Sequence, residues 1–189
     1  MGRWRPDARQ RLEKAALELY QERGFAQTTV TEVAERAGLT ERTFFRHFVD
    51  KREVLFSAGD AFGQTLVEAI ENAPSKLSPI DAVGVAVEAT AAFFENRLEF
   101  VRVRQSVIAE NPELQERERI KLASLVSLLA DGLRRRGVAD PAASLAAEMG
   151  ITVFRIAMGR WINEPNGPSL AMLMRDSLDA LKKVSAGKR

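Results

Sequence analysis

The spacing of the apolar residues constrains this chain more than any other feature. Ala8, Leu12, Ala15 and Leu19 recur every three or four positions, as residues on one face of an α-helix do, and Gly24 ends that segment. The same period returns along the chain, up to a last segment over about residues 169–184. Alternation with period two is not seen over a useful length. The sequence therefore predicts an all-α fold of about nine helices.

Capping residues set the expected helix boundaries. Thr29 and Glu32 have the spacing of a capping box, in which the Thr29 hydroxyl accepts from the Glu32 amide. Asp50 and Glu53 repeat this spacing, and we expect them to open one long helix that reaches about residue 70. A capping residue followed by proline marks later helix starts at Ser78-Pro79, Asn111-Pro112 and Asp140-Pro141.

Composition excludes several classes of function. Of the 189 residues none is cysteine, and His47 is the single histidine, so thiolate chemistry and a multi-histidine metal site are ruled out. No glycine-rich phosphate loop is present, and we expect neither an enzyme nor a cofactor. No apolar stretch reaches the ~20 residues that span a bilayer, which favours a cytoplasmic protein without membrane contact. The net charge of the whole chain is only +2, but residues 1–52 hold 11 basic against eight acidic residues. The excess of basic residues therefore lies in the N-terminal quarter of the chain.

Residues 30–48 have the pattern of a helix, a turn at Gly38 and a second short helix. The spacing predicts that one set of apolar side chains packs inward: Val30, Val33, Ala34, Ala37, Leu39, Phe44 and Phe48. Burial of this set leaves Arg42, Thr43, Phe45, Arg46 and His47 on the outside or at its rim. A short helix that carries cations and small polar groups on its free side suits a DNA major groove.

The segment TTVTEVAERAGLTERTFFRHF, residues 28–48, is followed by DKRE at 50–53. In these letters, and over about residues 8–60, the chain resembles the DNA-binding domain of TetR-family transcriptional regulators. The resemblance implies a homodimer that binds a palindromic operator and acts as a repressor released by a small molecule. It implies a helix-turn-helix domain over 1–50 and an effector-binding and dimerisation domain over 51–189.

By this resemblance, Thr43 and His47 match contact positions and Lys51 matches a phosphate contact. Phe45 stands where the family usually has a tyrosine whose hydroxyl contacts a phosphate. Arg42 either reads a base, grips a phosphate or is merely solvated, and Arg5 belongs either to a free tail or to a minor-groove arm. The full predicted DNA-binding set is Arg5, Thr29, Thr40, Arg42, Thr43, Phe45, Arg46, His47 and Lys51.

Two helical faces in the second half are candidates for the dimer interface, with the chain's own core as the alternative. One is a small-residue face, which allows close helix approach, and the other is a leucine-rich face. The predicted interface residues are Ala146, Gly150, Val153, Ala157, Leu170, Leu173, Met174, Leu178 and Leu181.

Aromatic, methionine and valine side chains are candidates for a pocket that holds a small apolar or amphipathic effector, although ordinary core packing explains them as well. Arg155 is predicted either to form an ion pair with another helix or to anchor an anionic head group. The predicted pocket residues are Phe93, Phe94, Phe100, Val103, Val107, Met149, Phe154, Arg155, Met158 and Trp161.

A helical protein-interaction adaptor is the alternative function. It would share the fold but lack DNA binding that falls steeply with salt.

Overall fold

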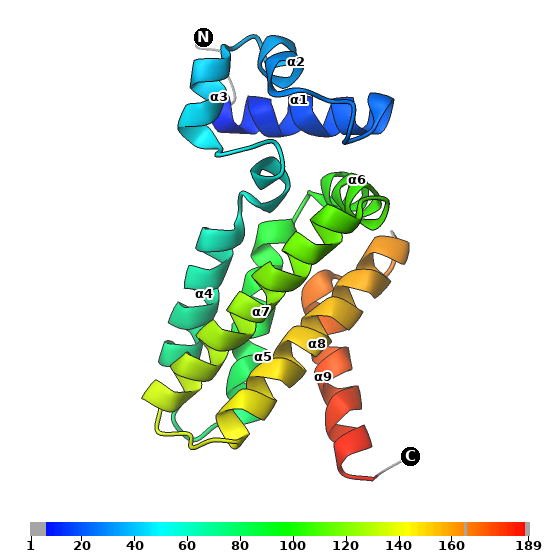
Figure 1. Ribbon diagram of the computed structural model, residues 1–189. Coiled ribbons are helices and arrows are strands. Elements are labelled where there is room, and N and C mark those ends of the chain that lie inside the picture. The colour runs from blue at the N-terminus through cyan, green and yellow to red at the C-terminus, as the bar shows by residue number, and fades with distance from the viewer. Residues whose placement is uncertain (1–6, 165, 188–189) are drawn as a thin grey trace, which may run out of the picture. The chain divides into compact units, whose positions relative to one another are not determined.

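The computed structural model describes residues 7–164 and 166–187, and these ranges contain nine α-helices, two 3-10 helices and no strand (Figure 1). The all-α prediction is confirmed. The elements are α1 (Ala8–Arg23), α2 (Val30–Arg36), α3 (Glu41–His47), η1 (Glu53–Phe56), α4 (Gly59–Asn72), α5 (Pro79–Ala89), η2 (Thr90–Phe94), α6 (Leu98–Ala109), α7 (Pro112–Arg135), α8 (Ala142–Asn163) and α9 (Leu170–Ser185).

The chain forms two compact units, and each is discontinuous in sequence. The first contains the residues up to Ala58 together with Glu99–Glu118, and the second contains Gly59–Leu98 together with the chain from Arg119 onward. The predicted boundary after residue 50 therefore needs correction. Most of α6 and the start of α7 join the N-terminal unit because Val107, Ile108 and Leu114 are buried in the same core as Leu12.

In the first unit, α1, α2 and α3 surround a core that includes Phe44, which is fully buried. The predicted capping box is present, since the Thr29 hydroxyl accepts from the Glu32 amide and the Glu32 carboxylate accepts from the Thr29 amide. Thr40 caps α3 by accepting from the Thr43 amide at 3.2 Å. Local capping therefore sets where both short helices begin.

The prediction of one long helix that starts at Asp50 is wrong. The Asp50 carboxylate does accept from the Arg52 and Glu53 amides, at 2.8 and 3.0 Å, but these bonds open only the 3-10 turn η1, and α4 begins later, at Gly59. Val54, Leu55 and Phe56 are three consecutive buried residues, whereas an amphipathic helix buries one face only.

Proline marks two later helix starts as expected. Ser78 caps α5 with Pro79 in its first turn, and α7 begins at Pro112. The third start is shifted by one residue, since α8 begins at Ala142 after Pro141. The Asp140 carboxylate accepts instead from Arg134 of α7, at 2.9 Å.

The second unit packs α4, α5, η2, the rest of α7, α8 and α9 around a separate apolar core. Figure 1 shows α8, in yellow, beside α9, in orange and red. Among the described residues, α8 is the one helix long and apolar enough to cross a membrane by length and composition. Its side chains at Ala147, Ile151 and Ala157 are part of this core.

Candidate nucleic-acid interface

The position of α3 follows from two aromatic anchors. Phe44 and Phe48 have exposed fractions of 0% and 4%, so the inward face of α3 is fixed against the first unit's core. Arg42, Phe45 and Arg46 are exposed as a result, and Phe45 retains 55% of its accessible surface. Thr43 and His47 are half-buried at the rim. The inward and outward assignments from the sequence are confirmed.

The basic side chains near α3 differ in whether the fold uses them. Most cations between residues 7 and 58 bind to a carboxylate or to backbone carbonyl oxygens: Arg9, Arg11, Lys14, Arg23, Arg36, Lys51 and Arg52. Within that range, Arg42 and Arg46 form no hydrogen bond or ion pair with a described residue. Their guanidinium groups, four residues apart on α3, are therefore free to meet an external anion or base edge.

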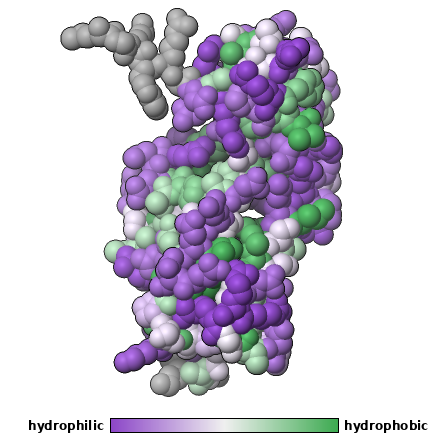
Figure 2. Space-filling model, turned by 90° about the vertical axis from the view of Figure 1, so that its left-hand side faces the viewer, coloured by the Kyte–Doolittle hydropathy of each residue, from purple (hydrophilic) through white to green (hydrophobic). Residues whose placement is uncertain are grey.

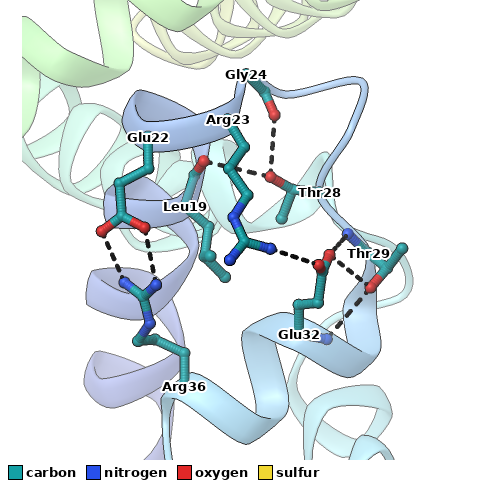
Figure 3. Close-up of polar contacts among 8 residues, drawn as sticks. All are labelled: Leu19, Glu22, Arg23, Gly24, Thr28, Thr29, Glu32 and Arg36. Carbon is teal, nitrogen blue, oxygen red and sulfur yellow. Dashed lines mark hydrogen bonds and ion pairs between the residues drawn. The ribbon is translucent and has the colours of Figure 1, made fainter.

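The cations of α1 and α2 instead hold these helices together, as Figure 3 shows. Arg36 donates to both carboxylate oxygens of Glu22, at 2.9 and 2.8 Å, and Arg23 donates to Glu32 at 2.8 Å. The hydrogen bond from Arg36 lowers the pKa of Glu22 below its usual value. These pairs lie at the solvent-exposed surface, so each contributes little stability.

Lys51 has a different role from the predicted phosphate contact. Its ammonium nitrogen lies 2.8 Å from the carbonyl oxygens of Phe25 and Thr28 and 3.2 Å from that of Ala26, and 4.5 Å from the Phe25 ring centroid. An ammonium group has three donors, and these carbonyls engage all of them. The prediction is corrected: Lys51 fixes the loop between α1 and α2.

Tyr20 supports the same anchor from α1. Its hydroxyl donates to the Lys51 carbonyl oxygen at 2.7 Å. Burial, with a smaller contribution from the charge of Asp50, raises the pKa of Tyr20 above its usual value, so the phenol stays protonated as a donor.

The remaining predicted DNA residues have mixed positions. Thr29 and Thr40 are exposed, but their hydroxyls cap α2 and α3. The His47 Nε2 atom is buried without a hydrogen-bond partner among the described residues, so a phosphate contact from this ring requires Nδ1. Arg5 lies outside the described residues.

Several predicted pocket residues meet in an aromatic cluster in the second unit. The Phe62 ring centroid lies 5.3 Å from that of Phe154, 5.9 Å from Phe93 and 6.0 Å from Phe94. Trp161 lies 6.4 Å from Phe94, and Met158 packs against the same core. Phe62 was not among the predicted pocket residues, because its helical spacing marked it only as core.

The rest of the predicted pocket set does not join this cluster. Phe100, Val103 and Val107 belong to the core of the first unit, because α6 packs there. Arg155 is exposed and pairs with no described residue, so the predicted ion pair with another helix is not seen among the described residues. Met149 is half-buried on α8.

The predicted dimer faces need correction too. Ala157 and Leu173 are 0% exposed, and a Cβ atom added at Gly150 would lie 2.1 Å from Val83 Cγ1. Small residues on α8 therefore serve close packing within the chain. The buried members are Ala146, Gly150, Val153, Ala157, Leu170, Leu173 and Met174, while Leu178 and Leu181 are half-buried.

The exposed apolar side chains of these two helices lie elsewhere. Leu145 and Ile156 of α8 retain 55% and 53% of their surface, and Met172 of α9 retains 47%. On the face drawn in Figure 2, hydrophobic residues form separate patches among hydrophilic ones.

The fold and the α3 surface define a helix-turn-helix regulator, and comparison with known proteins agrees. The family model for bacterial regulatory proteins of the TetR family matches residues 12–58, and that for the MftR C-terminal domain matches residues 77–186. The chain belongs to the TetR family of DNA-binding transcriptional regulators.

Three relatives illustrate the range of similarity. The regulator TcmR of Streptomyces glaucescens is 37% identical over 81 residues, which cover 43% of this chain and 36% of TcmR. MftR of Mycobacterium tuberculosis, named for mycofactocin biosynthesis, is 28% identical over 72% of this chain and 69% of MftR. The match with TcmR, described first, therefore covers about a third of the length of that protein. The repressor FadR of Thermus thermophilus, solved with lauroyl-CoA, is 25% identical with a TM-score of 0.56, covering 93% of both chains.

Proposed function

We propose that this protein is a bacterial, cytoplasmic repressor that binds a palindromic operator as a homodimer and leaves it when a small apolar or amphipathic effector binds. The observation that carries the DNA-binding role is the pair of free guanidinium groups, Arg42 and Arg46, on the exposed face of α3. Every other cation between residues 7 and 58 is engaged within the fold. The planar guanidinium group of arginine can donate two hydrogen bonds at once to the edge of a guanine or to a phosphate.

Selection of bound duplexes from a random pool tests this role. We expect an inverted repeat whose half-sites lie one helical turn apart, about 34–36 Å. Fluorescence polarisation at two salt concentrations then separates the two candidate functions. A regulator loses affinity steeply as salt rises, whereas an adaptor enriches no sequence and shows no such dependence.

Dimerisation is supported by the exposed face of α8. Leu145, Thr152, Ile156 and Gly159 are separated by seven, four and three residues, so they share one helical face, and all are exposed. A second copy packed on this face would cover apolar side chains that the chain's own core leaves in solvent. The same symmetry would present two α3 helices to an inverted repeat.

The effector role is supported by the aromatic cluster around Phe62. Its rings meet at tilted or edge-on angles, so the surface that this cluster offers is aromatic and apolar. Arg155 is exposed, so it is not available there as an anchor. These observations favour a ligand whose inserted part is apolar and uncharged.

Trp161 provides a direct readout of effector binding. Titration of a Trp4→Phe variant with an uncharged aromatic compound and with a fatty acid should change the Trp161 emission and raise the melting temperature. Phe62→Ala should weaken both responses. If neither compound changes the Trp161 emission or the melting temperature of the Trp4→Phe protein, the assignment of the effector site to this cluster is contradicted.

A further inference from the structure

Phe45 is an aromatic side chain left exposed on the surface assigned to DNA. The residue retains 55% of its surface, and its ring centroid lies 5.5 Å from that of buried Phe44, at an interplanar angle of 83°. Phe44 thus supports one part of the Phe45 ring, while more than half of the residue faces solvent. The ring is a fixed apolar projection rather than a component of the core.

The neighbours of Phe45 indicate what it would meet. Arg42 and Arg46, three positions before and one after, have no partner among the described residues. A phenyl ring has no hydrogen-bonding group, so it cannot donate to a phosphate or to a polar base edge. The apolar group that a major groove offers is the C5-methyl group of thymine.

We propose that Phe45 reads a thymine methyl group in each operator half-site, so that sequence selection depends on that methyl group. The inference rests on the proposed insertion of α3 into the major groove. Phe45 is then a specificity-determining residue, beside the cationic contacts of Arg42 and Arg46.

Thr43 is the competing reader, because threonine also carries a methyl group. Its position is less favourable: the side chain is half-buried, and its hydroxyl lies 3.1 Å from that of Thr40, which holds it toward the start of α3. A single substitution distinguishes the two residues, since Thr43→Ser removes only the methyl group.

Deoxyuridine differs from deoxythymidine only in lacking the C5-methyl group, so its incorporation into the DNA isolates the contribution of that methyl group to binding. Loss of one buried methyl contact corresponds to roughly fourfold in affinity per half-site. Operator duplexes from the selection experiment, randomly substituted with deoxyuridine, would be sorted into bound and free fractions. The positions at which uracil is depleted from the bound fraction would then be mapped.

We expect depletion at one or two thymines per half-site for the wild type, for the ring-preserving Phe45→Tyr and for Thr43→Ser. The depletion should disappear in Phe45→Ala, with helicity checked by circular dichroism. If Phe45→Ala binds too weakly to sort, Phe45→Leu should show the depletion reduced by at least half.

Three results would overturn the inference: no depletion in the wild type, an unchanged pattern after truncation of Phe45, or loss of the pattern in Thr43→Ser. Failure of the wild type to bind any duplex would instead refute the proposed function itself.

Discussion

The ammonium nitrogen of Lys51 lies 2.8 Å from the carbonyl oxygen of Thr28, the residue that precedes the N-cap of α2. This bond connects the segment that follows α3 to the start of the helix-turn-helix. Lys51, which the sequence predicts to touch DNA, therefore stabilises the conformation of the DNA-binding surface.

Replacement of Lys51 by methionine should therefore lower stability, because three backbone carbonyls lose their charged donor. Hydrogen bonds to charged groups contribute about 1.5–3 kcal/mol, so we expect a loss of that order in urea unfolding. The slope of log affinity for DNA against log salt should stay unchanged in the folded variant. A slope reduced by about one unit, with stability intact, would restore the phosphate contact.

Gly150 should not tolerate a methyl group. A Cβ atom there would lie 2.1 Å from Val83 Cγ1, and overpacking of this kind typically costs about 1–3 kcal/mol. Gly59, at the start of α4, is the control, since a Cβ atom there has no neighbour within 4 Å. Thermal unfolding should show Gly150→Ala well below the wild type and Gly59→Ala at or above it, and equal melting temperatures would contradict the packing.

Acid should weaken the contact between α5 and α9. Hydrogen bonds from Lys182, and then from Ser78, lower the pKa of Asp81 below its usual value. The folded state thus favours the carboxylate, and this contribution is present above the ordinary value near 3.9 and lost as pH falls through the lowered value.

Unfolding measured from pH 7 down to about 2 tests this. Asp81→Asn should be less stable than the wild type at pH 7, and the difference should shrink below about pH 4. A gap that stays constant with pH would show that the Asp81 charge contributes nothing.

A charge on the exposed face of α8 should prevent dimerisation. Ile156 retains 53% of its surface, so Ile156→Glu leaves the core of its own chain intact but puts a carboxylate in the proposed interface. Analytical ultracentrifugation should show a dimer for the wild type and a monomer for Ile156→Glu. Ile120→Glu, at an exposed apolar residue of α7, is the control and should remain dimeric.

The helix-turn-helix could be predicted from sequence because its determinants are local. The spacing of Phe44 and Phe48 fixes which side of α3 is buried, and the Thr29–Glu32 box sets where α2 begins. Lys51 could not be assigned this way, because its partners are backbone carbonyls, which leave no pattern in the sequence.

For apolar residues in the second half of the chain, prediction from sequence has a different limit. Helical spacing identifies Val107 and Ala157 as inward-facing, but it does not say which core each one joins. Small residues such as Gly150 allow close helix approach equally well within a chain and between chains. Only tertiary packing separates these outcomes.

The role of the exposed face of α3 in DNA binding is tested most directly by comparing two arginines of the same unit in operator binding. Arg42 of α3 pairs with none of the residues that the structure describes, whereas Arg36 of α2 is held by Glu22 at 2.8 Å. We expect Arg42→Ala to lose about 1–3 kcal/mol of operator affinity and to relax the preference at one base position, while Arg36→Ala binds as the wild type does. Equal affinity for the wild type and Arg42→Ala, or a larger loss in Arg36→Ala, would contradict the role given to the exposed face of α3.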